Sequence, residues 1–156
     1  MIGGLGALHA VTMTAPLYNP EILRLAASIP FDGRLARPMA SVEKRSPVCG
    51  SRVTVDVDLD EAGRVARTGM LVRACALGQA SAALMAAHAV GRSADELAEA
   101  RDGLAAWLAG EGPVPEWPGL AILEPALPHR GRHAAIRLAF EAVAEAAALA
   151  RRSEAA

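Results

Sequence analysis

The sequence predicts an α+β fold in which an N-terminal helix and C-terminal helices pack on one face of a small three-stranded antiparallel sheet. The extended segments gather between residues 40 and 72, and most helical segments follow residue 76. Strands in one block and helices in another distinguish this class from alternating α/β folds. At 156 residues the chain fits one domain. We expect that domain over residues 17–152, after a disordered tail over residues 1–16.

The composition excludes several classes of protein. The net charge is −1, whereas nucleic-acid-binding domains carry a strongly basic face. Two cysteines are too few for a disulfide-dense secreted scaffold. Residues 1–16 lack the basic region of a signal peptide and are shorter than the roughly 20 apolar residues that span a bilayer. We therefore predict no nucleic acid partner, no membrane segment and a cytoplasmic location in which both thiols stay reduced.

A short helix is predicted at the start of the domain. Asn19 is a suitable N-cap, Pro20 fits the first helical position, and Glu21 complements the helix dipole. The helix is expected to end just before Pro30, because a proline disfavours helical backbone in the residue before it. Residues 31–39 contain a glycine and a proline and are predicted to form a loop.

The clearest periodicity lies in residues 53–60, where apolar and polar residues alternate strictly. This pattern predicts a half-buried strand with one face in water. Strands over residues 40–46 and 65–72 are expected on either side of it, joined to it by turns. Its polar face carries Asp56 and Asp58, followed by Asp60. We interpret that face as solvated rather than as a cation site, because the glycine and distal glutamate of a calcium loop are missing.

The second half of the chain is predicted to be helical. Three helices are expected, over residues 76–90, over residues 93–108 and from Gly131 or Arg132 to Arg152. The first consists almost wholly of small residues, and the second opens with a Ser93/Glu96 capping box. The third carries an apolar stripe at helical spacing. Residues 110–128 hold five of the ten prolines and are predicted to form a loop, with a short helical turn at 119–123.

The two cysteines flank the predicted hairpin. Cys49 lies in the turn before the central strand, where Gly50 permits a sharp bend. Cys75 follows the third strand and opens a helix, and unpaired N–H groups at a helix start stabilise a thiolate. The hairpin is expected to bring both sulfurs to one end of the sheet. They could bind a metal there, or pack as small hydrophobes, which is the commoner role of a free cysteine.

Histidines supply further candidate ligands. Residues 127–133 contain two histidines and two arginines before the last helix, and imidazole often joins thiolates in zinc sites. His133 is the better placed of the two, because it is close to the helix start. His129 is interpreted as part of a solvated, positively charged loop. His88, near the end of a helix, is interpreted as structural.

Two segments resemble the motifs of the U-type iron–sulfur cluster scaffolds, the group of the NifU N-terminal domain, IscU and SufU. Residues 47–51, PVCGS, are similar to the motif P-x-C-G-D. Residues 73–81, RACALGQAS, are similar to the motif G-C-A-I-S-x-A-S, which opens an alanine-rich helix. The spacing of the cysteines and residues 17–20, LYNP, also resemble the family, and the proline-rich segment 110–128 resembles the SufU branch. The resemblance covers residues 17–150.

The resemblance implies a scaffold that receives sulfur from a cysteine desulfurase, builds a [2Fe–2S] cluster on three cysteines and an aspartate, and serves acceptor apo-proteins. In the SufU branch it implies a persulfide relay at a zinc-bound site. Cys49 and Cys75 match the first two cysteines of the family. Ser51 stands in place of the aspartate, Ala134 or Ala135 in place of the third cysteine, and His133 at or near the family histidine.

Three hypotheses follow, in order of preference. The first is a non-enzymatic scaffold that binds iron, zinc or a cluster through Cys49, Cys75 and His133, with Ser51 beside them, and docks a cysteine desulfurase. An external ligand, or a second chain in a homodimer, would complete the site, since two thiolates and an imidazole leave one zinc position open and a [2Fe–2S] cluster needs four ligands. The second is a U-type fold without metal that binds or regulates partners in cluster assembly. The third is a sulfurtransferase that carries a persulfide on one of the two cysteines.

Overall fold

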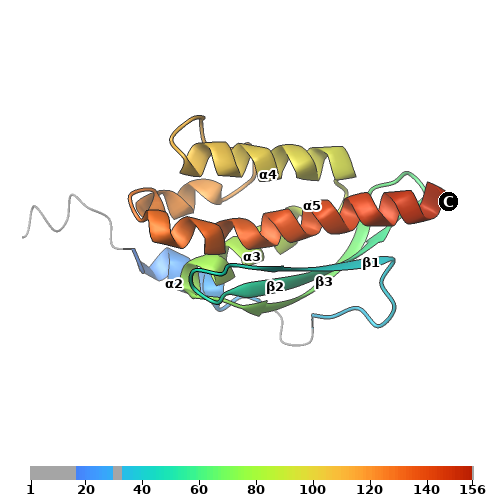
Figure 1. The fold of residues 1–156 in the computed structure, drawn as a ribbon, viewed down its shortest axis with the longest axis horizontal. Helices are drawn as coiled ribbons and strands as arrows, with labels where there is room; N and C mark the ends of the chain where they lie inside the picture. Colours follow the sequence, from blue (N-terminus) through green and yellow to red (C-terminus); the bar gives the residue numbers. More distant parts are fainter. Residues whose placement is uncertain (1–16, 30–32, 156) are drawn as a thin grey trace, which may run out of the picture.

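The computed structural model describes residues 17–29 and 33–155, so the tail predicted over residues 1–16 lies outside the described part (Figure 1). Its elements, in chain order, are α2 (Pro20–Ala26), β1 (Ala40–Arg45), β2 (Arg52–Leu59), β3 (Val65–Arg73), α3 (Ala76–His88), α4 (Ala94–Leu108), the 3₁₀ helices η1 (Leu120–Ala126) and η2 (Arg130–Arg132), and α5 (His133–Ala155). No helix in the described ranges has the length and apolar character needed to cross a membrane.

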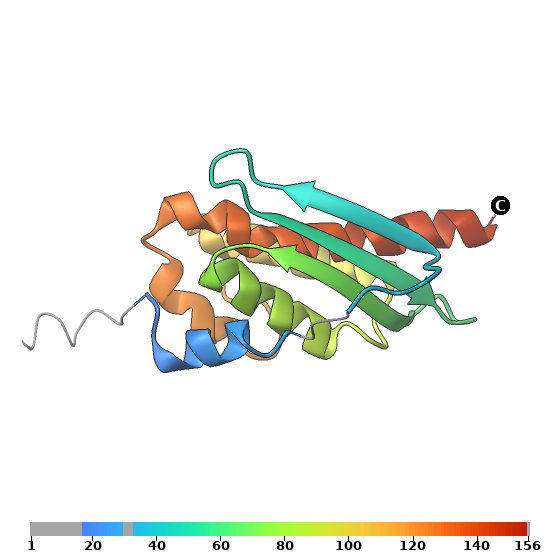
Figure 2. The same cartoon turned by 90° about the horizontal axis from the view of Figure 1, so that it is seen from below.

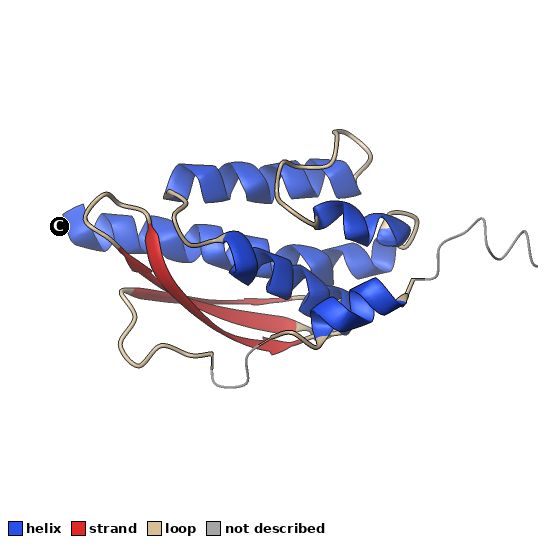
Figure 3. Cartoon of the chain, turned by 180° about the vertical axis from the view of Figure 1, so that it is seen from behind, coloured by secondary structure: helices blue, strands red, loops and turns tan. Residues whose placement is uncertain are grey.

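The strands form an antiparallel sheet in the order β1-β2-β3, and the helices pack on one of its faces (Figures 1 and 3). α5 lies along β1 and β2, and α4 packs on the side of α5 away from the sheet. α3 packs beside α5, and α2 packs on α3 (Figure 2). The predicted α+β architecture, with helices on one face of a three-stranded antiparallel sheet, is confirmed.

The core lies between β2 and the apolar stripe of α5. Val53, Val55 and Val57 point inward from the sheet and are fully buried, as are Ile136 and Phe140 of α5. Burying an aliphatic or aromatic side chain of this size contributes about 1.5–3 kcal/mol. The strict alternation in the sequence therefore located the inward face of β2 correctly.

Small residues bring the starts of α3 and α5 close together. A Cβ added to Gly78 of α3 would lie 3.2 Å from the carbonyl oxygen of Ala135 in α5. The buried Ser81 hydroxyl donates a hydrogen bond of 2.6 Å to the carbonyl of Ile136. The residue that precedes α3, Cys75, is thereby held next to the first turn of α5.

The polar face of β2 is not in water, so the prediction of a solvated aspartate face is wrong for two of the three residues. Asp56 is fully buried and Asp58 is 9% exposed. The loop before β1 covers them: Arg34 binds the Asp56 carboxylate with two nitrogens, at 2.7 and 3.1 Å, and Leu35 N–H donates to it at 2.9 Å. Asp58 accepts a backbone hydrogen bond from the same loop. Asp60, in the β2–β3 turn, is exposed as predicted.

Boundaries differ from the predictions in the last third of the chain. The helical turn expected at 119–123 is the longer 3₁₀ helix η1, which includes Pro125. α5 begins at His133, because Arg130–Arg132 form the 3₁₀ turn η2 before it. The proline-rich segment is pinned to the core by Trp117, whose indole N–H donates to the carbonyl of Leu84 at 2.8 Å.

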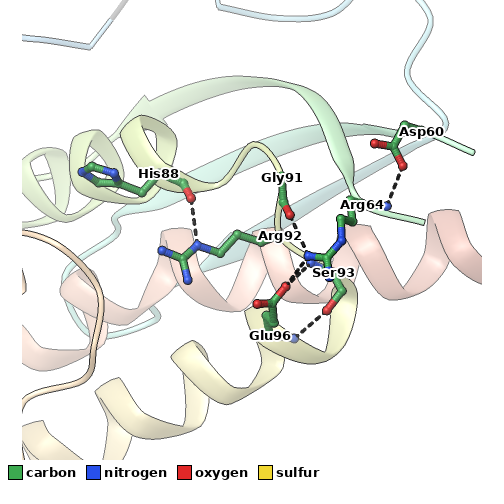
Figure 4. A network of polar contacts seen from close by, with 7 residues as sticks. All are labelled: Asp60, Arg64, His88, Gly91, Arg92, Ser93 and Glu96. Carbon is green, nitrogen blue, oxygen red and sulfur yellow. Dashed lines mark hydrogen bonds and ion pairs between the residues drawn. The ribbon is translucent and has the colours of Figure 1, made fainter. Parts of the chain in front are cut away.

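A polar network ties the β2–β3 turn to the junction of α3 and α4 (Figure 4). Arg64 donates to the carbonyl of Gly91 at 2.8 Å and pairs with Glu96 at 2.7 Å. Ser93 and Glu96 form the capping box predicted from the sequence. This network holds the end of the sheet opposite to both cysteines, because β2 begins beside Cys49 and ends at this turn.

Gly69 lets the loop before β1 lie directly on the sheet. A Cβ at this position would overlap the carbonyl oxygen of Gly33 and lie 2.6 Å from the nitrogen of Leu35. Both atoms belong to backbone and cannot move without shifting the loop. We expect Gly69→Ala to lower the free energy of unfolding by about 2–3 kcal/mol, measured by urea denaturation. Gly131→Ala is the control, because nothing lies within 4 Å of the added carbon; equal losses in the two variants would contradict this account.

Candidate metal-binding site

The turn between β1 and β2 presents Cys49 to solvent. Ser46 N–H donates to the carbonyl of Ser51 at 2.8 Å, and Gly50 N–H donates to the carbonyl of Ser46 at 2.9 Å. Gly50 has a φ of 74°, in the left-handed region that a residue with a side chain rarely adopts. These bonds close the turn and leave the Cys49 side chain exposed.

Cys75 is the N-cap residue of α3. Its backbone is extended, its carbonyl accepts the hydrogen bond from Gln79 N–H at 2.9 Å, and its side chain makes no capping hydrogen bond. The thiol is partly buried. The sulfur is therefore not occupied in capping the helix.

Both cysteines border one cavity of about 320 Å³ at this end of the sheet. Ser51 and the starts of α3 and α5 complete its wall; the lining residues are Cys49, Gly50, Ser51, Arg73, Ala74, Cys75, Gly131, Arg132 and Ala135. We call this cavity the thiol pocket. The hairpin brings the two sulfurs to the same end of the sheet, as the sequence predicted.

Two serine hydroxyls stabilise the thiolate of Cys49. The Cys49 sulfur and the Ser51 hydroxyl oxygen are 3.1 Å apart. The Ser46 hydroxyl is buried and has no hydrogen-bond partner among the described residues, so it is free to donate to a thiolate. The Ser46 hydroxyl, followed by the Ser51 hydroxyl and backbone, holds the pKa of the Cys49 thiol below its ordinary value, and burial opposes this only weakly.

Alkylation by iodoacetamide measures this effect. In a Cys75→Ser background, where Cys49 is the only thiol, we expect the reaction to reach half its limiting rate at a lower pH than that of an ordinary cysteine, whose pKa is about 8.5. Ser51→Ala should slow the reaction at pH 7 by about two- to fivefold, since it removes one hydrogen bond to the thiolate. Ser153→Ala, on the exposed end of α5, is the control. An unchanged pH profile in Ser51→Ala would refute the role of that hydroxyl.

The three histidines of the described residues lie outside the thiol pocket. The Nε2 atom of His133 is 3.0 Å from the carbonyl oxygen of Ala126, so it carries the hydrogen and donates it. His129 is exposed in the loop before η2, and His88 lies on α3 with its ring edge toward Trp117. In the described ranges no three of the side chains of His, Cys, Asp and Glu gather as metal ligands would. The structure thus brings Cys49, Cys75 and Ser51 together, but not His133.

The pocket decides one choice that the sequence left open, and it contains two arginines to which sequence reasoning gave no role in the site. Ala135 lines the thiol pocket and Ala134 does not, which selects Ala135 as the residue opposite the two cysteines. Arg73 and Arg132 add two positive charges to the wall. Arg73 precedes the Cys75 motif by two residues at the end of β3, so its position next to the site could have been inferred from the predicted strand.

Three solved structures resemble this chain. The N-terminal part of a nitrogen-fixing NifU-like protein from Brucella abortus is 38% identical, with a TM-score of 0.81 over 87% of this chain and 95% of that chain. A candidate iron–sulfur cluster assembly scaffold for the SUF system from Fervidobacterium islandicum is 19% identical, with a TM-score of 0.73 over 84% and 96%. A hypothetical protein is 23% identical, with a TM-score of 0.71 over 82% and 94%. No protein-family model and no curated protein sequence matches the chain.

The fold and its thiol pocket define a U-type scaffold, and the resemblance drawn from the two cysteine motifs is confirmed. The chain belongs to the family of the NifU N-terminal domain, since it is 38% identical to the Brucella protein over nearly the whole of that structure. The two more distant structures share the fold.

Proposed function

We propose that the protein is a cytoplasmic iron–sulfur cluster assembly scaffold that takes iron, zinc or a nascent cluster as cargo between Cys49 and Cys75. The observation that carries this proposal is the thiol pocket, where the only two cysteines of the chain border one open cavity. Membership of the NifU family and the name of the SUF-system structure support it. In this account the protein is a carrier, not an enzyme, and it serves a cysteine desulfurase and acceptor apo-proteins.

The metal ligands present at the thiol pocket suit a metal ion that is bound jointly by this chain and another molecule. Thiolates bind zinc and iron well, and both metals take four ligands in closed thiolate sites. This chain offers two thiolates and the Ser51 hydroxyl at the pocket. The missing ligands would come from a partner, a small molecule or a second copy, or from His133 after its ring leaves the carbonyl of Ala126.

The residues of the pocket suit delivery of a loosely held cargo. Cys49 is exposed and its pKa is lowered by the two serines, so more of it is thiolate at a given pH than of an ordinary cysteine. Arg73 and Arg132 line the same cavity and offset the negative charge of the two thiolates. Fewer protein ligands make the cargo easier to release to an acceptor.

Anaerobic reconstitution with iron and sulfide tests the proposal. We expect wild-type protein to retain iron and sulfide with thiolate-to-iron absorbance, and Cys49→Ser and Cys75→Ser each to retain little. His129→Ala is the matched control for adventitious binding to an exposed imidazole, and circular dichroism checks that all variants fold. Wild-type protein that holds no more metal than Cys49→Ser would refute the proposal.

A sulfur carrier is the second candidate, favoured by the exposure and lowered pKa of Cys49. The Cys49 thiolate would attack the outer sulfur of a desulfurase persulfide, breaking its S–S bond and releasing the desulfurase thiolate. Mass spectrometry after incubation with a desulfurase and cysteine should then show one added sulfur atom on Cys49. A protein that binds the desulfurase but gains neither sulfur nor metal would instead be a metal-free binding partner.

A further inference from the structure

Three arginines form a row across the sheet next to the thiol pocket. Arg45 of β1 pairs directly with Arg52 of β2, and Arg52 pairs directly with Arg73 of β3. Like charges directly opposite one another on neighbouring strands destabilise a sheet. We call Arg45, Arg52 and Arg73 the arginine row. Such a row is costly unless something negative binds it.

The described part of the chain supplies little of that negative charge. Glu43 pairs with Arg45 and also lies within electrostatic reach of Arg52. Within residues 17–29 and 33–155, neither Arg52 nor Arg73 forms a salt bridge. Two guanidinium groups are therefore left to bind an anion.

The arginine row lines a cavity of its own, of about 490 Å³, together with Ser46, Pro47 and Gly50. Among the described residues, no carboxylate borders it. Ser46 is 2% exposed and its hydroxyl has no hydrogen-bond partner in the described structure. A buried hydroxyl without a partner can donate a hydrogen bond to an anion that the arginines attract. The Ser46 hydroxyl has one proton to donate. It can donate it to the Cys49 thiolate or, when a metal binds that sulfur, to an anion in the cavity.

The anion site adjoins the thiol pocket. Gly50 and Arg73 border both cavities, so a molecule bound to the arginine row can extend past Arg73 to the two sulfurs. Each cavity has the size of a small-molecule site rather than of a protein interface. The two cavities together suit a small molecule that has carboxylates for the arginine row and, at its other end, an atom that can bind a metal.

We propose that the arginine row binds the carboxylates of a low-molecular-weight thiol, whose sulfur completes the metal coordination begun by Cys49 and Cys75. This inference rests on the proposed function, because it supplies a metal ligand beyond those that the described residues place at the thiol pocket. On binding, the thiol releases its proton to solvent and its thiolate replaces a water or other weak ligand on the metal. No electron is transferred, so no oxidant or reductant is needed.

Reduced glutathione, a thiol with two carboxylates, is the probe, and three proteins are compared anaerobically. They are the wild type, the Arg52→Gln/Arg73→Gln double variant, and an Arg24→Gln/Arg152→Gln control with the same change in net charge at exposed sites away from both cavities.

In the first experiment, S-methylglutathione, which has no thiolate to bind a metal, is titrated into metal-free protein by calorimetry. In the second, loss of zinc to a chelator is timed with glutathione or with 2-mercaptoethanol, a thiol without carboxylates.

We expect S-methylglutathione to bind the wild type and the control about tenfold more tightly than the double variant, since two charge-assisted pairs are lost. We expect glutathione to slow zinc loss about tenfold more than 2-mercaptoethanol does, and the double variant to lose this difference. Equal protection by the two thiols in wild-type protein would overturn the inference, even if S-methylglutathione binds. That result would not affect the proposed function. Wild-type protein that binds no zinc under any of these conditions would contradict both the proposed function and this inference.

Discussion

Ala135→Cys is expected to raise the affinity of the chain for zinc by roughly 100- to 1,000-fold. Ala135 lines the thiol pocket with Cys49 and Cys75, so a sulfur added there gives a third thiolate. Four-ligand zinc sites in small domains bind with about 10–16 kcal/mol, so one ligand is worth about a quarter of that, or roughly 2.5–4 kcal/mol. Competition with a chromogenic chelator at pH 7 measures the change.

Ala134→Cys is the matched control for this gain. Ala134 is the preceding residue on the same helix, but it does not border the pocket. Its thiol is expected to raise zinc affinity little, and circular dichroism shows whether either variant perturbs the helix. An equal gain in both variants, or none in a folded Ala135→Cys protein, would mean that the two native thiols and the start of α5 do not share one site.

Asp56→Asn is expected to cost about 2–4 kcal/mol of stability, because a fully buried carboxylate loses its charge-assisted bonds to Arg34, Ser41 and Leu35. The side chain of Arg34 is 47% exposed and can turn to solvent, which keeps the cost below that of a fully buried pair. For a chain of this size the melting temperature should fall by about 5–15 °C. Asp60→Asn is the control, since Asp60 is exposed on the same hairpin and should change stability by less than about 0.5 kcal/mol.

The pH dependence of Asp56→Asn supplies an independent check. Burial alone would raise the pKa of Asp56, but the hydrogen bonds from Arg34, Ser41 and Leu35 and the charge of Arg34 outweigh it and hold the pKa below its ordinary value. A carboxyl with a lowered pKa stabilises the fold above its ordinary pKa of about 3.9 and loses that effect as the pH falls through the folded pKa. The stability difference between wild type and Asp56→Asn should therefore be full at pH 6 and shrink below about pH 4. A difference that stays constant down to pH 3 would contradict this account.

The sequence could predict those parts of the fold that local periodicity and capping control. Asn19 caps α2 and Ser93 caps α4 as predicted, and the buried valines of β2 follow the alternation. It could not predict what covers the second face of the sheet. The aspartates there look solvent-exposed, because alternation does not show that an arginine 22 residues earlier returns in a loop to pair with Asp56.

The candidate site was predictable only in part, for a similar reason. Cys49 and Cys75 lie at the two ends of a hairpin, and hairpin pairing alone brings them together. The side-chain direction of His133 depends on the turn η2 before it and on its hydrogen bond to the carbonyl of Ala126. No local sequence pattern reveals either of these. The choice between Ala134 and Ala135 depends on the helical phase of α5, and that phase was fixed by the observed start of the helix.

The metal content of freshly purified protein tests the central claim most directly. Wild-type protein and Cys49→Ser are purified in parallel without added metal and analysed by mass spectrometry of the elements. The account predicts about one zinc or iron per chain, or per two chains if the site is shared, in the wild type, and a loss of most of it in Cys49→Ser. Wild-type protein that contains no more zinc or iron than Cys49→Ser would contradict the claim that the two thiols form a metal-binding site.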